Sequence, residues 1–333
     1  MDDSWYQIAD SGGPDRVNLR RVDAAHPIDL YRGKDHLGNY VFSFHGEVSD
    51  PESLELPDLG RIELILRPLG REGPHRWELT ARLLDPEHKD IFRALCADLI
   101  AATQVLGEGE HQAAFRVIVR RLQRWQALLR ENSRRELSFQ ARLGLFGELL
   151  VLRDRLLPRL ESAAAVQAWR GAEGDEQDFL LPAGVVEVKT QLASTDKSIK
   201  VASEHQLFDS ALPVWLCHQT IAVGSDATEG ASSLGSIVEE IRGMLHYESS
   251  WSRDLFDARL LECGYSRSRD ALDDAWMLAE RSWYHVTGDF PRVTPMDLRS
   301  GVECVRYGIR PEACKPYEVR EEIALSGILE CDE

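Results

Sequence analysis

The stretch GVVEVKT, residues 184 to 190, places the strongest constraint on how this chain folds. Val186 and Val188 alternate with Glu187 and Lys189, and successive side chains of a β-strand point to opposite faces of the sheet. Glu187 and Lys189 therefore project together from a strand whose other face is apolar. An acid and a base side by side on such a strand indicate either a surface ion pair or a reactive site.

The segments around this strand predict a mixed α/β domain. From residue 138 onward, apolar periodicity indicates a helix, three short strands, a fully apolar strand, two helices and one further strand. The predicted elements span residues 142–156, 178–181, 185–190, 199–203, 214–223, 234–245, 251–262 and 275–286.

The chain before residue 138 has a different character. Residues 1–84 alternate apolar and polar positions between turn signals, as in Tyr40, Phe42 and Phe44, which predicts a β-rich domain. A helical connector over 85–137 follows, in which Asp85 caps the first helix and a second helix spans about 110–131. Residues 138–333 are predicted to form the α/β domain with a C-terminal extension.

Composition limits the classes of function. The 333 residues have a formal charge of −17, which argues against a protein that coats nucleic acid by bulk attraction but allows a locally basic groove. No apolar run is long enough for a membrane span, and the N-terminus is acidic, so we expect a soluble cytoplasmic protein. The six scattered cysteines are expected to be free thiols.

One helix concentrates positive charge. Between residues 116 and 142 lie eight arginines and two glutamates, and Arg116, Arg120 and Arg124 recur every four residues, so they form one stripe. A solvated helix face is the simpler interpretation of this stripe. A face that contacts nucleic-acid phosphates is the alternative.

Asp178 lies upstream of Glu187, across a turn signal, PAG. If the two strands form an antiparallel hairpin with an even-numbered loop, Asp178 shares a face with Glu187 and Lys189; in the register considered, residue 181 faces 186 and residue 178 faces 189. An odd-numbered loop would turn Asp178 to the other face.

A second acid precedes this hairpin on the predicted helix. Leu145, Leu149, Leu152 and Leu156 form an apolar stripe, and Glu148 lies beside it. A carboxylate at a core-facing edge is costly unless it is paired or binds a metal ion. Gly144 and Gly147 precede it and permit close approach of another backbone.

Converging carboxylates repel one another unless a cation lies between them, and all-oxygen ligands favour Mg²⁺ or Mn²⁺. A lysine beside them can orient or activate water, or stabilise charge on a phosphorane. The pattern therefore predicts metal-assisted phosphodiester hydrolysis, with Asp178, Glu187 and Glu148 as metal ligands and Lys189 as a further catalytic residue. Taken alone, EVK is more typical of an ion pair on a strand than of a nuclease motif, and the combined pattern is what favours the nuclease.

The segments GELLVL, WRG, DF, VVEVKT and SEHQL together resemble the PD-(D/E)XK nuclease superfamily, which has the restriction-endonuclease-like fold. The resemblance is strongest to a bacterial family of PD-(D/E)XK motif proteins that occur beside restriction–modification and phage-defence genes. It implies that Asp178, Glu187 and Lys189 are the D, E and K of the motif, and that Glu148 is the helix acid. Gln177 stands where the motif has proline.

The resemblance also implies a mixed sheet flanked by helices, with an N-terminal β-rich domain, and it extends the candidate site. Gln206 matches a glutamine near the scissile phosphate, although Ser203 and Gln206 also fit a helix capping box. Lys197 and Lys200 are candidate phosphate contacts or solvated residues, and Trp169 is expected to pack within the fold rather than stack on a base.

The function that follows is a Mg²⁺-dependent deoxyribonuclease, an endonuclease component of a bacterial restriction or phage-defence system. Expected partners are DNA and other subunits such as a methyltransferase or ATPase, with a homodimer as a further possibility and no membrane association. The alternative is a catalytically silent nuclease-fold subunit that binds DNA or proteins. Walker A, GxGxxG, GxSxG and HExxH motifs are absent from the sequence.

Overall fold

A computed structural model describes residues 5, 7–13, 17–51, 54–70, 76–131, 137–173, 175–195, 198–209, 212–224, 230–246, 250–265 and 274–330. The chain divides into two compact units. Unit 1 comprises Met1–Arg135 and Glu248–Leu261, and unit 2 comprises Glu136–Tyr247 and Glu262–Glu333. Each unit has its own β-sheet.

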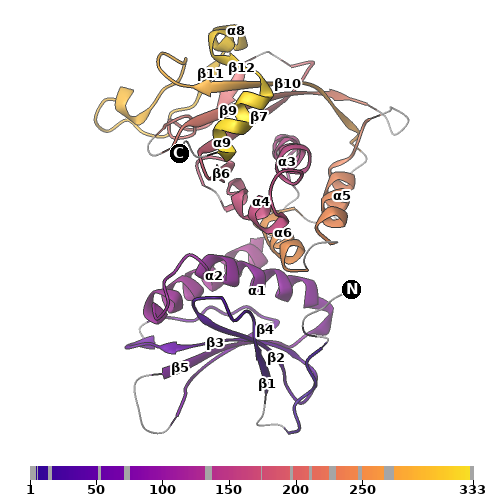
Figure 1. Cartoon of the computed structure of the whole chain (residues 1–333), viewed down its shortest axis with the longest axis vertical. Coiled ribbons are helices and arrows are strands. Elements are labelled where there is room, and N and C mark those ends of the chain that lie inside the picture. The colour runs from indigo at the N-terminus through magenta and orange to yellow at the C-terminus, as the bar shows by residue number, and fades with distance from the viewer. Residues whose placement is uncertain are drawn as a thin grey trace. The chain divides into compact units, whose positions relative to one another are not determined.

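The sheet of unit 1 is antiparallel, with the order β1-β2-β3-β5-β4. Two helices, α1 (Lys89–Thr103) and α2 (His111–Glu131), cover one face of it (Figure 1). The strands are β1 (Asn18–Arg21), β2 (Asp29–Lys34), β3 (Tyr40–Glu47), β4 (Ile62–Pro68) and β5 (Arg76–Leu83). The prediction of a β-rich N-terminal region is confirmed.

The helices of unit 1 begin and pack as the sequence predicts. The Asp85 side chain accepts a hydrogen bond from the Glu87 amide at the start of the 3₁₀-helix η2 (Pro86–His88), which leads into α1. Phe44 from the sheet, Leu95 from α1 and Phe115 from α2 are buried in one hydrophobic core. That core explains why α1 and α2 pack onto the sheet instead of forming a separate connector.

Helix α6 (Ser250–Glu262) also packs into unit 1, up to Leu261, although it lies within the predicted α/β region. Ala258 is part of the unit 1 core, and Asp254 forms an ion pair with Arg93 of α1 at 3.0 Å. These contacts explain why the division by packing differs from the boundaries drawn from sequence periodicity, which carries no information on the partner of a helix.

The sheet of unit 2 has the order β12-β10-β9-β7-β6. Strands β7 and β9 are parallel and the other neighbours are antiparallel, so the sheet is mixed. The strands are β6 (Phe179–Leu181), β7 (Gly184–Leu192), β9 (Val214–Val223), β10 (Trp276–Val286) and β12 (Glu318–Val319).

Different elements cover the two faces of this sheet. Helix α3 (Phe139–Val151) approaches Thr190 of β7, and α9 (Glu321–Leu329) approaches Trp215 of β9, on the same face. On the opposite face, Val185 and Leu216 form a hydrophobic cluster with a two-stranded sheet of β8 (Ile199–Val201) and β11 (Tyr307–Ile309). The predicted α/β fold, a mixed sheet flanked by helices, is confirmed.

The remaining elements of unit 2 connect these layers. They are the π-helix η3 (Leu152–Leu156), α4 (Ser162–Ala168), η4 (Gly171–Glu173), α5 (Leu234–His246), η5 (Pro295–Asp297), α8 (Pro311–Cys314) and η6 (Lys315–Tyr317). Within the described ranges, no helix is long and apolar enough to cross a membrane. Cys96, Cys217, Cys304 and Cys314 are free thiols, as predicted, and Cys331 lies outside the described ranges.

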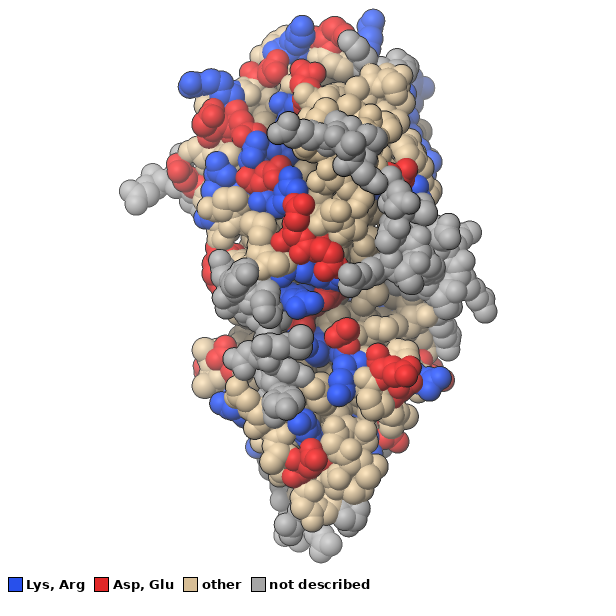
Figure 2. All heavy atoms as spheres, turned by 90° about the vertical axis from the view of Figure 1, so that its right-hand side faces the viewer, with Lys and Arg blue, Asp and Glu red and all other residues tan. Residues whose placement is uncertain are grey.

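Figure 2 shows one face of the molecule, on which acidic and basic side chains are interspersed. The net charge of −17 is therefore not gathered into a single acidic surface on that face. On a mixed surface of this kind, the local charge and not the total charge determines where a polyanion can bind.

Candidate active site

Strands β6 and β7 form a hairpin with a two-residue turn, Pro182 and Ala183. The predicted even-numbered loop is confirmed, but the register considered from sequence is wrong, because residue 181 faces 184 and Phe179 faces Val186. Asp178 lies just before β6, and its amide donates a 3.0 Å hydrogen bond to the Val186 carbonyl, so it does not pair with Lys189. The two-residue turn sets the β6–β7 register, since a tight hairpin fixes the register through its loop length.

Lys189 lies at the centre of the site. Its Nζ is 2.6 Å from Oε1 of Glu187 and donates a hydrogen bond of 2.9 Å to Oε1 of Gln206. The same Gln206 oxygen accepts a bond from the Ala202 amide at 2.8 Å. Residues 204–207 form a turn and not a helix, so the capping-box interpretation of Ser203 and Gln206 is wrong.

Asp178 is fixed to the neighbouring strand by its own carboxylate. Oδ2 accepts a hydrogen bond from the Val188 amide at 2.7 Å. Burial raises the pKa of Asp178 to about 6, although the Val188 amide and the charge of Lys189 oppose the change. An aspartate with a pKa this close to neutrality gains a proton readily unless a cation is close.

Glu187 is the most deeply buried acid of the site, with an exposed fraction of 1%. Lys189 contacts Oε1, while no donor among the described residues reaches Oε2. Burial and the charge of Asp178 raise the pKa of Glu187 well above its usual range. A buried carboxylate oxygen without a donor is costly, which leaves a position for a cation or a proton.

Glu148, from helix α3, is the third acid. The Trp169 indole donates a hydrogen bond of 2.7 Å to its Oε2. The carboxylates of Glu148 and Asp178 both lie beside Gly171, where a Cβ atom would be 2.7 Å from Oδ1 of Asp178 and 3.1 Å from Oε2 of Glu148. Burial and the Asp178 charge raise the pKa of Glu148 to about 8.

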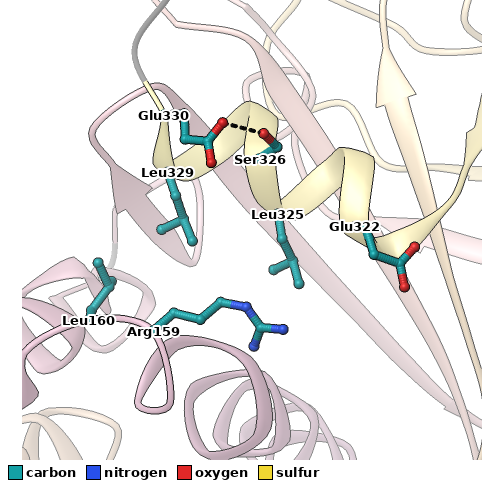
Figure 3. Close-up of a pocket in the computed structure, with 7 residues that line it drawn as sticks. All are labelled: Arg159, Leu160, Glu322, Leu325, Ser326, Leu329 and Glu330. Carbon is teal, nitrogen blue, oxygen red and sulfur yellow. Dashed lines mark hydrogen bonds between the residues drawn. The ribbon is translucent and has the colours of Figure 1, made fainter.

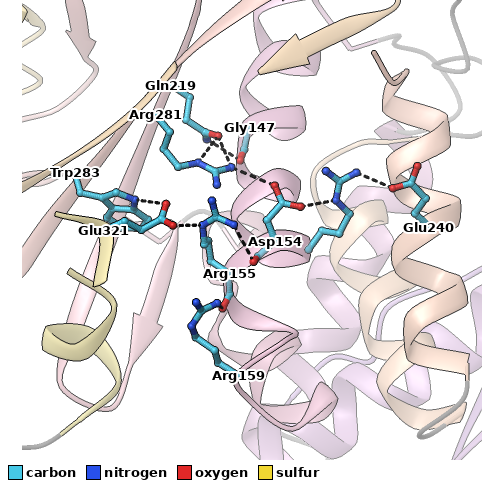
Figure 4. A network of polar contacts seen from close by, with 10 residues as sticks. Gly147, Asp154, Arg155, Arg159, Gln219, Glu240, Arg281, Trp283 and Glu321 are labelled. Carbon is cyan, nitrogen blue, oxygen red and sulfur yellow. Dashed lines mark hydrogen bonds and ion pairs between the residues drawn. The ribbon is translucent and has the colours of Figure 1, made fainter. Parts of the chain in front are cut away.

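A polar network on the other face of the sheet holds α3 in place (Figure 4). The Gln219 side chain donates a 2.9 Å hydrogen bond to the Gly147 carbonyl and accepts two from Arg281. Gly147 packs so closely that a Cβ atom there would collide with the Thr190 side chain. Glu148 therefore follows a residue fixed to both β7 and β9.

The three acids do not form a ready-made metal centre. In the described part of the chain, no three His, Cys, Asp or Glu side chains are grouped closely enough to hold a metal ion. Mg²⁺ commonly takes only one or two carboxylates and keeps several waters. The interacting pair of Asp178 and Glu187, with Oε2 of Glu187 lacking a donor among those residues, fits such an ion.

Sequence reasoning did not find two neighbours of the site residues, one beside Glu148 and one beside Lys189. The Trp169 indole is buried, as expected for a side chain that packs within the fold, yet it also binds Glu148. The sequence does not single out His218, but this residue pairs with Lys189 in the β7–β9 register and is buried, and burial lowers its pKa to about 4. Only the strand pairing, which sequence periodicity does not give, would have revealed this neighbour.

The predicted phosphate contacts fall in both units. Arg116 and Arg120 are exposed on α2 of unit 1, and Arg124 is partly buried. Lys200 is exposed on β8 of unit 2. Lys197 lies outside the described residues.

A groove elsewhere in unit 2 has a volume of about 590 Å³ (Figure 3). Arg159 and Leu160 line one side and helix α9 lines the other, with Glu322 and Glu330 among its residues. One cation and two acids give the groove a net negative charge, which does not suit a phosphate-bearing ligand. The predicted site residues do not line it.

Comparison with known families finds a matching family model for this chain. A family model described as "Putative PD-(D/E)XK family member, (DUF4420)" matches residues 1–310. Neither a curated protein nor a solved structure matches the chain. Because the family model covers most of its length, the chain belongs to this PD-(D/E)XK family.

Proposed function

We propose that this PD-(D/E)XK family member is a Mg²⁺-dependent deoxyribonuclease, with Mn²⁺ as an alternative ion. The observation that carries the proposal is the group of Asp178, the buried Glu187 and Lys189 at one hairpin, in which Oε2 of Glu187 has no donor among the described residues. An ion pair that served stability alone would have its buried oxygens satisfied.

Lys189 is the residue that we assign to the reacting phosphate or water. Its ammonium has three N–H donors, and Glu187 and Gln206 take two of them. The third can donate to a phosphate oxygen or to the attacking water. A fixed positive charge at that point stabilises the negative charge that develops in the transition state.

Asp178 and Glu187 would hold the ion, and Glu148 would bind it less directly, since the Trp169 indole already occupies its Oε2. A bound Mg²⁺ would polarise the phosphate and lower the pKa of water. With a pKa of about 8, Glu148 holds a proton at neutral pH in the absence of the ion. It can therefore take up or release a proton near the site.

The arginine stripe on α2 is proposed as a DNA contact in unit 1. It consists of the exposed Arg116 and Arg120 and the partly buried Arg124. Replacing all three with alanine should weaken DNA binding evenly across sequences and make its salt dependence shallower. Unchanged binding in this variant would identify the stripe as solvated surface.

The biological setting is a further part of the proposal. A cytoplasmic role in a restriction or phage-defence system, with a methyltransferase or ATPase as partner and a homodimer as one assembly, is supported by the resemblance alone. Co-purification of such subunits with the chain expressed from its own operon would support it. A chain that cleaves DNA fully by itself would remove the need for them.

The test is cleavage of plasmid DNA by the full chain with and without Mg²⁺. Asp178→Asn and Glu187→Gln should abolish cleavage, while the control Glu322→Gln, an exposed acid on α9, should cut like wild type. A wild-type chain that binds DNA but never cuts it would instead support the silent nuclease-fold subunit. Equal activity in all variants would contradict the site assignment.

A further inference from the structure

The two-stranded sheet of β8 and β11 has one buried and one exposed face. Ile199, Val201 and Ile309 are buried in the hydrophobic cluster beneath it. Because strand side chains alternate, Lys200 and its cross-strand partner Gly308 lie on the outward face. Both are exposed, so this face is open to solvent.

The same alternation places two arginines on that face. Arg306 and Arg310 flank β11, two residues on either side of Gly308, and both are exposed. Segments 198–202 and 306–310 contain Lys200, Arg306 and Arg310 and no acid, in a chain of charge −17. None of these three side chains forms an ion pair with a residue in the described ranges.

Gly308 adds no side chain to the centre of this face. A Cβ atom there would collide with the Ser198 hydroxyl and lie 3.6 Å from Nζ of Lys200. The lysine ammonium therefore lies close to the Gly308 backbone. A glycine within a strand often marks a place where a ligand or another backbone approaches closely.

This face is joined directly to the candidate active site. Ala202, next after β8, donates to the Gln206 oxygen that also binds Lys189. The amide of Val305, next before Arg306, donates a 2.8 Å hydrogen bond to the buried Glu204. Both strands are thus fixed to the turn that holds Gln206.

We propose that the outward face of β8 and β11, through Lys200, Arg306 and Arg310, binds the phosphate backbone of DNA beside the cleavage site. The inference rests on the proposed nuclease function and names where the substrate is held. Guanidinium groups match phosphate geometry with paired N–H donors, and the lysine adds a point charge. Three cations without an ion-pair partner in the described ranges supply, next to the site, the local attraction that the acidic chain as a whole lacks.

The test measures binding of a short DNA duplex to the full chain, without divalent cations, over a range of salt concentrations. Lys200→Ser/Arg306→Ser/Arg310→Ser should bind more weakly. Its plot of log K against log salt should be shallower by about 0.9 for each phosphate that the variant no longer neutralises, or roughly 2.7 for three. With Mg²⁺ present, KM for cleavage should rise and kcat should stay near the wild-type value.

The matched control removes the same charge from exposed positions outside this sheet, Arg299→Ser/Lys315→Ser/Arg320→Ser. It should bind and cut almost as wild type does. Equal weakening in both variants would show a long-range charge effect and overturn the proposed contact. A wild type that cuts DNA, together with a β8–β11 variant whose binding is unchanged, would overturn this inference alone. A wild type that neither binds nor cuts DNA would overturn the nuclease proposal as well.

Discussion

Glu78 in unit 1 and Glu187 in unit 2 are both buried within a β-sheet beside a basic side chain, with exposed fractions of 3% and 1%. Glu78 accepts hydrogen bonds from Ser43 and from Arg67, and His45 lies 3.3 Å from its Oε1. Glu187 contacts Lys189 through one oxygen, and its other oxygen has no donor among the described residues.

The pKa values follow from these surroundings. Burial disfavours the charge of Glu78, but His45, Arg67 and Ser43 outweigh it and lower the pKa to about 2. Burial and the Asp178 charge raise the pKa of Glu187. A satisfied buried acid serves the fold, whereas a buried acid that shares one lysine with two further acids costs stability and points to a functional role.

The largest expected difference is in the rate of DNA cleavage when the basic partner of each acid is replaced by alanine. Lys189→Ala should reduce DNA cleavage on the order of 10²–10³-fold, because it removes a charge that acts in the transition state. Arg67→Ala should leave cleavage unchanged, since Arg67 contacts Glu78 in unit 1. Plasmid cleavage rates measure both, and a Lys189→Ala enzyme with wild-type rate would exclude the lysine from the mechanism.

Mg²⁺ should stabilise the folded chain through the acids of the candidate site in unit 2 and not through Glu78 in unit 1. An ion that binds only the folded state at about 100 times its Kd adds roughly 2.7 kcal/mol to the free energy of unfolding. Thermal unfolding should shift upward with Mg²⁺ in wild type and in Glu78→Gln, but not in Asp178→Asn. Lys189→Ala should keep the shift. An equal shift in Asp178→Asn would place the ion elsewhere.

Replacing each acid by its amide should change stability in opposite directions. Glu78→Gln replaces one carboxylate oxygen with an amide nitrogen, which faces the donor of either Ser43 or Arg67, and it should lower the free energy of unfolding by about 1–3 kcal/mol. Glu187→Gln should raise it when no divalent cation is present, because folding no longer buries or protonates a carboxylate. Chemical denaturation measures both, and destabilisation by Glu187→Gln would show that this acid supports the fold.

A further difference is expected in the pH dependence of stability. The Glu148 pKa is about 8 in the folded state against 4.5 for an unperturbed glutamate, so its contribution falls as pH rises from about 4.5 to 8. The Glu78 pKa is about 2, so its contribution is lost as pH falls from about 4.5 to 2. Metal-free Glu148→Gln should show a flatter curve above pH 4.5 than wild type, and an unchanged curve would contradict the raised pKa.

Periodicity and turn chemistry predict much of the local structure. The alternation in GVVEVKT corresponds to β7, and the loop between β6 and β7 has an even number of residues, as predicted. The predicted pairing is off by two residues, since residue 181 faces 184 and not 186, because PAG fits both a two-residue and a four-residue loop. Local sequence limits the register to a few choices, and packing selects among them.

Long-range contacts explain what the sequence could not show. The capping box predicts a helix at Ser203, but the Ser203 hydroxyl donates to Glu176 and the Gln206 oxygen binds Lys189, so a turn forms instead. Strand β8 is predicted from the sequence, whereas its partner β11, about a hundred residues later, is not. Each of these depends on residues that only the folded chain brings together.

Helix α6 makes the chain enter unit 1 twice, since segments Met1–Arg135 and Glu248–Leu261 both belong to it. If the chain were cut at residue 137, α6 would stay on the C-terminal fragment. Ala258 and the ion-paired Asp254 would then lose their partners in unit 1. The family model, which spans residues 1–310, includes both segments. In evolutionary terms, exchanging unit 1 for another domain needs more than one recombination junction, because its two segments are separated by residues of unit 2.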